Sequence, residues 1–182
     1  MSIVSVGNLF ETGEILLNGW AYFITLLAII VAINAVNMSD GIHGLAAGNS
    51  LITFLAILLL SINNTPNQDL SIPILFCSVI PVFLIFNLSK SRRIFMGDAG
   101  SMFLGMGIVW LLLDLSQGEA RIFNPVTALW IFATPLIDIV SVFTRRLIAG
   151  TSPFKADVFH MHHLLLHLGF KQKDVLFMIL LF

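Results

Sequence analysis

Five long apolar stretches dominate the chain, and each approaches the length that an α-helix needs to cross a membrane. They cover residues 20–38, 45–62, 72–88, 102–115 and 125–143. A helix rises about 1.5 Å per residue, so roughly 20 apolar residues cross the hydrocarbon core of a bilayer. A sixth apolar stretch opens at Val175. The pattern predicts an all-α, polytopic membrane helix bundle with about five full transmembrane helices and the start of a sixth.

The composition is typical of an integral membrane protein. Hydrophobic residues make up 58% of the chain and charged residues 10%, with a mean hydropathy of +0.98. A soluble domain carries roughly 25% charged residues. The one cysteine, Cys77, lies within an apolar stretch, which excludes an internal disulfide framework. We expect residues 1–182 to form a single membrane domain in contact with the lipid bilayer, with no nucleic-acid partner.

Basic residues gather in two of the polar segments between the apolar stretches. Lys90, Arg92 and Arg93 follow the third stretch, and most of the remaining lysines and arginines follow the fifth. Because cationic loops stay cytoplasmic, segments 39–44, 89–100 and 144–174 are predicted to be the cytoplasmic loops of a multi-pass protein of the inner (plasma) membrane. All five histidines lie in these segments, on the side that cytoplasmic nucleotides reach.

Aspartate stands beside glycine in two strings, residues 37–44 and 95–101, at the ends of apolar stretches. A carboxylate at the mouth of an apolar helix is costly unless it binds something, and glycine lets backbone approach a bulky ligand. Capping is the alternative for Asp40, before a turn at Gly41, and for Asp98 at a helix start. Two such strings on one face favour a site for Mg²⁺ shared with substrate phosphates.

His160, His162 and His163 lie together in the basic segment after the fifth stretch. A transition-metal site is one interpretation, although no cysteine or nearby histidine repeat completes a tetrahedral set. Imidazoles among arginines and lysines favour contact with a diphosphate instead. Asp138, three residues after Pro135 in the fifth stretch, is a functional candidate because intramembrane carboxylates are costly. The alternative for Asp138 is a structural hydrogen bond to a neighbouring helix.

Several separated motifs, in a fixed order, resemble the polyprenyl-phosphate N-acetylhexosamine-1-phosphate transferases of glycosyltransferase family 4. The matching segments are 34–44, 95–101, 125–130, 135–138, 145–146, 152–154 and 160–163. The pair Pro153-Phe154 and the spacing of the three histidines are most similar to the undecaprenyl-phosphate N-acetylglucosamine-1-phosphate transferase branch. The resemblance runs from about residue 33 to residue 170.

The resemblance implies a reaction in cell-envelope polysaccharide biosynthesis. N-acetylhexosamine-1-phosphate, GlcNAc-1-phosphate in this branch, passes from a UDP-N-acetyl sugar to polyprenyl (undecaprenyl) phosphate, and UMP is released. The implied cofactor is Mg²⁺, or Mn²⁺ in its place, with Asp98 as the metal ligand. The implied catalytic residues are Asp40, His160, His162 and His163. The implied nucleotide-binding residues are Asn37, His43, Phe95 and Gly97, where the ring of Phe95 stacks on uracil.

The chain departs from the family pattern at three places. His43 stands where a second aspartate of the first string is usual, and Val158 stands where an arginine before the histidines is usual. Family members have about ten or eleven spans, and their aspartate-rich N-terminal half has no counterpart in this sequence. The resemblance therefore covers the C-terminal portion only. We expect a longer natural protein, a partner chain or a homodimer to supply the missing half.

Two other functions stay open from the residues alone. A truncated or degenerate relative would bind nucleotide or lipid phosphate without turnover, or act as a membrane assembly partner. A transporter would also hold a carboxylate such as Asp138 in a proline-broken span. The polar residues of this chain gather at the cytoplasmic ends of the stretches rather than at midplane, which favours the transferase.

Overall fold

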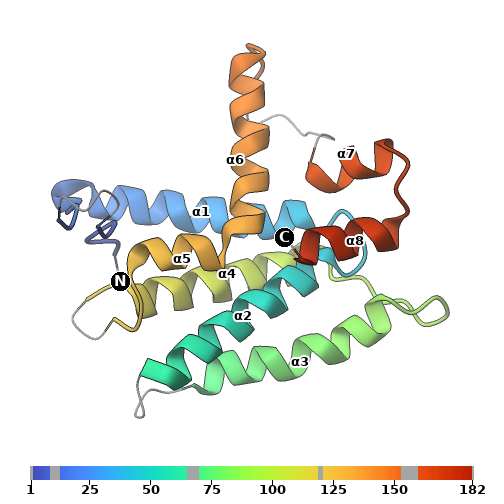
Figure 1. The fold of residues 1–182 in the computed structure, drawn as a ribbon, viewed down its shortest axis with the longest axis horizontal. Helices are drawn as coiled ribbons and strands as arrows, with labels where there is room; N and C mark the ends of the chain where they lie inside the picture. Colours follow the sequence, from blue (N-terminus) through green and yellow to red (C-terminus); the bar gives the residue numbers. More distant parts are fainter. Residues whose placement is uncertain (1, 9–12, 65–69, 119–120, 153–159, 182) are drawn as a thin grey trace.

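The computed structural model describes residues 2–8, 13–64, 70–118, 121–152 and 160–181, and its regular structure is helical (Figure 1). The elements are η1 (Asn18–Trp20), a 3₁₀ turn, and helices α1 (Ala21–Ser39), α2 (Leu45–Asn64), α3 (Ser71–Asn87), α4 (Gly97–Ser116), α5 (Pro125–Ile131), α6 (Ala133–Ile148), α7 (Met161–His167) and α8 (Gln172–Leu181). Ser5 and Leu16 form an isolated antiparallel bridge, and the described residues contain no longer strand. The all-α prediction is confirmed.

Within the described ranges, three segments are long and apolar enough to cross a membrane: Asn18–Ser39, Leu45–Ile62 and Gly97–Ser116. Helix α3 is apolar but has only 17 residues. Helices α5 and α6 meet the same criterion together and are bent by 83° at their junction. Length and composition thus support three spans, or four if the bent pair is one span, where the sequence predicted about five.

The bend between α5 and α6 falls at Phe132, beside a proline that removes a backbone donor. Pro135 has no N–H to donate to the carbonyl of Ile131, four residues earlier. The hydroxyl of Thr53, on α2, donates a long hydrogen bond of 3.5 Å to that carbonyl instead. Helix α6 leaves the bundle at this point, and Figure 1 shows it projecting away from the other helices.

Helices α1 and α4 pack closely and run antiparallel (Figure 1). A Cβ at Gly105 would lie 2.8 Å from the Cα of Ile33, so only glycine allows the two backbones to approach this closely. Asp40 follows Ile33 by seven residues, and Asp98 precedes Gly105 by seven. At about 1.5 Å per residue, both aspartates lie roughly 10 Å from the crossing point. The close crossing therefore brings both carboxylates to one end of the bundle.

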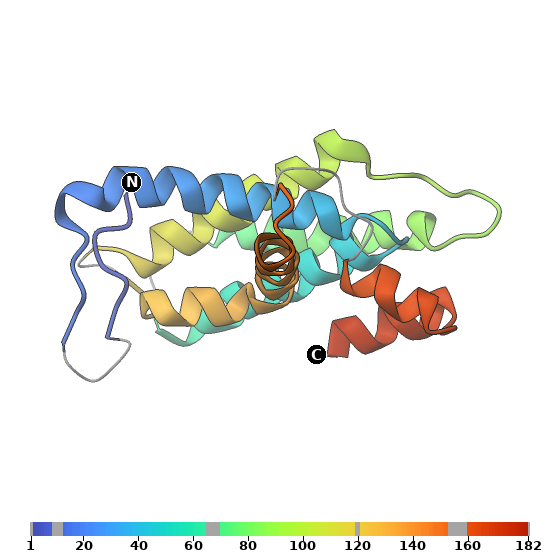
Figure 2. The ribbon, with the colours of Figure 1, turned by 90° about the horizontal axis from the view of Figure 1, so that it is seen from above.

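Helices α7 and α8 lie side by side at that same end (Figures 1 and 2). Ile42 and Leu45 from the α1–α2 turn form a small buried cluster with Val175 and Ile179 of α8. The predicted sixth apolar stretch is helical from Gln172, and its ten-residue helix packs against α7 and α2. This second cluster fastens the histidine-bearing segment to the turn that carries Asp40.

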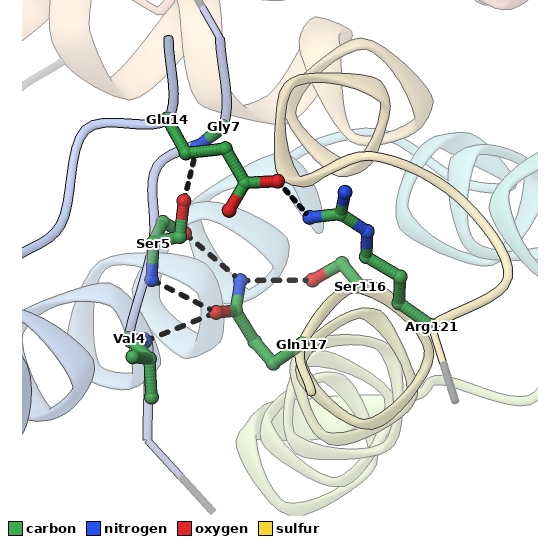
Figure 3. A network of polar contacts seen from close by, with 7 residues as sticks. All are labelled: Val4, Ser5, Gly7, Glu14, Ser116, Gln117 and Arg121. Atoms are coloured by element: carbon green, nitrogen blue, oxygen red, sulfur yellow. Dashed lines mark hydrogen bonds and ion pairs between the residues drawn. The ribbon is translucent and has the colours of Figure 1, made fainter. Parts of the chain in front are cut away.

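A polar network closes the opposite end of the bundle (Figure 3). The amide oxygen of Gln117 accepts the N–H groups of Val4 and Ser5 at 3.0 and 3.2 Å, and its amide nitrogen donates to the Ser5 carbonyl at 3.1 Å. Glu14 and Arg121 add a partly exposed ion pair of 2.6 Å. The network holds the N-terminal segment on the end of α4, far from the aspartates.

Candidate active site

The turn between α1 and α2 holds Asp40 at the mouth of the bundle. Asp40 caps α1 through its backbone N–H, which donates to the Asn37 carbonyl at 3.1 Å. The cap therefore makes no use of the Asp40 carboxylate. Gly44 has φ +85°, and a Cβ there would lie 2.8 Å from Cδ2 of Leu88. Both the backbone and the packing require glycine at this position.

Helix α4 begins in the second aspartate–glycine string. Gly97 opens the helix with φ +66°, and Asp98 follows, exposed, in its first turn. The buried hydroxyl of Ser101 lies 3.1 Å from the carbonyls of Gly97 and Asp98 and donates to them. The N-cap position belongs to Met96, so Asp98 complements the helix dipole without being the cap.

Asp98 lies close enough to Asp40 for its charge to act on the Asp40 carboxylate. Burial raises the pKa of Asp40, and the negative charge of Asp98 raises it further. Mg²⁺ is usually held by one or two carboxylates, while waters and substrate phosphates complete its shell. A half-buried and an exposed carboxylate that repel each other fit such an ion. Across the described segments, no group of three or more His, Cys, Asp or Glu side chains is arranged to hold a metal.

His43 and Phe95 join the two strings through their rings. The ring centroids are 5.3 Å apart and the planes are inclined by 58°. Phe95 is 74% exposed, so most of its ring remains available to a planar ligand. Burial lowers the pKa of His43, and the positive charge of Arg93 lowers it further. Both effects favour a neutral imidazole beside Phe95 at physiological pH.

His162 packs directly on Gly41, the residue after Asp40. A Cβ at Gly41 would lie 2.7 Å from Cε1 and 3.0 Å from Cδ2 of His162, and closer still to its Nε2. The His162 ring lies between those of His160 and His163, with centroid distances of 5.9 and 4.2 Å. Its Nε2 is buried and has no hydrogen-bond partner among the described residues.

The buried environment keeps His162 uncharged. Burial and, after it, the neighbouring His163 lower the pKa of His162 to about 4. A neutral imidazole at pH 7 carries one N–H donor and one acceptor nitrogen. The turn that carries Asp40 is therefore covered by a buried imidazole that adds no positive charge of its own.

Asp138 holds the start of α7. Its Oδ2 lies 2.9 Å from Nδ1 of His160, and its Oδ1 accepts the backbone N–H of Met161 at 2.8 Å. The sequence left two interpretations of this carboxylate open, and the structure shows a hydrogen bond. Its partners lie at the start of α7, the helix that carries His162 and His163.

The structure brings the predicted site residues to one end of the bundle through three links. Asp40 interacts with Asp98, His43 contacts Phe95, and Gly41 seats His162. The remaining predicted residues lie on the same three segments: Asn37, Gly97, His160 and His163. The departure at Val158 and the motif at 153–154 lie outside the described residues. The sequence did not predict the partners of Gly41 and Asp138. A pattern of residues along the chain does not indicate which distant segments come into contact.

Comparison with known proteins gives a family and a set of relatives. Residues 1–116 match the family model for glycosyl transferase family 4. Proteins named undecaprenyl-phosphate alpha-N-acetylglucosaminyl 1-phosphate transferase from Escherichia coli (strain K12) and Salmonella typhi are 39% and 40% identical to this chain over 181 residues. Each match covers 97% of this chain and 49% of the relative.

A protein of the same name from Pasteurella multocida (strain Pm70) is 41% identical over 108 residues, which are 58% of this chain and 30% of that protein. The chain spans about half the length of the curated relatives with the longest matches. No solved structure matches the chain.

Proposed function

Since the chain belongs to glycosyl transferase family 4, we propose that it forms part of an enzyme that transfers N-acetylglucosamine-1-phosphate from UDP-GlcNAc to undecaprenyl phosphate. The names of its relatives support this acceptor and this sugar. The proposal rests on one observation. Three separate segments bring Asp40, Asp98 and His162 to the same end of an apolar bundle. The proposed place is the cytoplasmic face of the plasma membrane, in cell-envelope polysaccharide synthesis.

The proposed reaction is a phosphoryl transfer. An oxygen of the acceptor phosphate attacks the phosphorus that bears the sugar, and the bond from that phosphorus to the bridging oxygen breaks. The bridging oxygen leaves with UMP, and the other product is an undecaprenyl diphosphate sugar. Such a transfer depends on positioning and on neutralising charge at the phosphate oxygens. Mg²⁺, held by Asp98 and Asp40, would supply the neutralising charge.

Other residues of the chain would bind the base and the phosphates of the donor. The exposed ring of Phe95 offers a face on which uracil can stack, with the neutral His43 at its side. His43 stands where the family usually has a carboxylate, so the base site is less negative here. The half-buried His163 offers an imidazole hydrogen bond to phosphate oxygens, while the buried His162 holds the histidine segment against Gly41. Asp40 lies on the turn that makes both contacts: Gly41 packs on His162, and His43 packs on Phe95.

A chimera tests the proposal, because the chain spans only about half of its relatives. This chain replaces the matching segment of the Escherichia coli relative, and UMP release is measured with UDP-GlcNAc, undecaprenyl phosphate and Mg²⁺. We expect release that needs both the acceptor and the ion, and that is lost in Asp98→Ala. Asp114→Ala, an exposed aspartate at the far end of the same helix, is the matched control and should retain activity. A folded chimera that releases no UMP would contradict the proposal and favour a non-catalytic relative.

A further inference from the structure

We propose that Asp138 is a positioning residue, which caps α7 from a different helix and sets the tautomer of His160. The proposal rests on the proposed function for its catalytic meaning, but its structural content stands on the geometry alone. Helix α7 begins after His160, and no side-chain hydrogen bond from His160 itself caps the helix. The cap comes instead from Asp138 on α6, whose Oδ1 accepts the Met161 N–H at 2.8 Å. One of the orphan donors at the start of α7 is thereby satisfied.

The second oxygen of the same carboxylate acts on the imidazole. Oδ2 lies 2.9 Å from Nδ1 of His160, and a carboxylate oxygen can only accept a hydrogen bond. Nδ1 must therefore carry the proton, and in the neutral ring Nε2 is left as the acceptor nitrogen. The side chains of His160 and Asp138 are 6% and 13% exposed, so water competes weakly for this bond. The carboxylate fixes both the backbone and the ring of the residue that starts the histidine helix.

The packing of His162 connects the contacts of Asp138 to the α1–α2 turn that carries Asp40. His162 follows His160 by two residues, and their rings are nearly parallel, at 10° and 5.9 Å. A cavity of about 10 Å³ lies between Asp138, His162 and the neighbouring ends of α1 and α2, which is room for about one water. The buried His162 ring packs against Gly41. Asp138 acts on the Asp40 turn through α7, without belonging to that turn.

The test reads the His160 tautomer directly. The full chain is labelled with ¹⁵N-histidine in lipid nanodiscs, long-range ¹H–¹⁵N spectra are recorded at pH 8, and His160→Gln assigns the His160 signals. We expect the Nδ1–H tautomer in the wild type. In Asp138→Asn, the Met161 N–H retains the amide oxygen, so the NH₂ group faces Nδ1 and should convert the ring to the Nε2–H tautomer. A merely structural contact would not reverse the tautomer.

The controls separate this proposal from a folding defect and from the proposed function. Asp114→Asn should leave every histidine signal unchanged, and His43 and His167 should keep their wild-type signals in Asp138→Asn. A wild-type ring in the Nε2–H form, or a tautomer unchanged by Asp138→Asn, would overturn the proposal. If Asp138→Asn does not fold, the wild-type tautomer alone decides. In the chimera, Asp138→Asn should lower kcat by about a hundredfold, as a misplacement of about 1 Å can do. A wild-type chimera without turnover would contradict the proposed function and leave the tautomer result intact.

Discussion

Replacing Gly41 with alanine should displace α7, which carries His162, from the α1–α2 turn that holds Asp40. The backbone of Gly41 does not lie in the left-handed region, so alanine is compatible with its conformation. The new methyl group would, however, lie 2.7 Å from Cε1 of His162, where ordinary contact begins at 3.4 Å. The ring must therefore move by at least 0.7 Å, and by more at Nε2. His162 is 2% exposed and lies between two other imidazoles, so it cannot turn away freely.

This displacement should weaken both stability and activity. Overpacking of this kind costs about 1–3 kcal/mol, and a misplacement of about 1 Å near the reacting groups can cost about a hundredfold in rate. We expect Gly41→Ala to lower the thermal unfolding midpoint of the chain in nanodiscs and to reduce UMP release by the chimera by about that factor. Gly19→Ala is the matched control, because no atom lies within 4 Å of a Cβ at Gly19.

A double-mutant cycle identifies the contact responsible. If the methyl group acts through His162, Gly41→Ala should cost little stability in a His162→Ala background. An equal loss of stability in both backgrounds would place the effect elsewhere. Wild-type stability and wild-type turnover in Gly41→Ala would refute the reasoning altogether, because they would mean that the His162 ring does not lie over the turn.

Three further predictions have defined outcomes. Arg93→Gln should raise the pKa of His43 in an NMR titration, because it removes a positive charge that lowers that pKa; an unchanged or lowered pKa would count against the contact. An unfolded His162 binds a proton below about pH 6.5 and the folded one only below about 4, so stability should fall by about 2 kcal/mol from pH 7 to pH 5. His162→Gln should remove that part of the loss in thermal unfolding at the two pH values, and equal losses would argue against a buried neutral ring. Gln117→Ala should cost about 2 kcal/mol through its backbone hydrogen bonds, whereas Arg121→Ala should cost at most about 1 kcal/mol because its ion pair is partly exposed; the reverse order in denaturation would contradict this ranking.

The helical class could be predicted from the sequence because apolar stretches of span length leave few alternatives in lipid. The bend at Phe132 could not, since the fifth stretch is predominantly apolar and a proline within a span is often tolerated. At the bend, the Thr53 hydroxyl donates a hydrogen bond to the Ile131 carbonyl, which Pro135 cannot pair with. That hydroxyl lies on another helix, 78 residues away along the chain. The local pattern predicted one span here, and the structure shows two helices bent by 83° at their junction.

The same limit applies to the site. Asp40 and Asp98 were predictable as a pair, because glycine beside a carboxylate at a helix end is an unusual and costly combination in an apolar chain. The close crossing at Gly105, which brings them to the same end, depends on the packing of α1 on α4. The role of Asp138 was open because a carboxylate in an apolar stretch indicates that it has a polar partner but does not show which residue that partner is. Only the fold assigns that partner as His160.

Binding of UMP with Mg²⁺ to the ¹⁵N-histidine-labelled chain tests the central claim, that three separate segments form one nucleotide-phosphate site. His43 reports on the base side and His163 on the phosphate side, while His167, exposed at the far end of α7, is an internal control. We predict that the signals of His43 and His163 shift with one common Kd, that His167 does not follow, and that Asp98→Ala removes the dependence on Mg²⁺. Separate Kd values for the two histidines, or no shift at either, would contradict a single site.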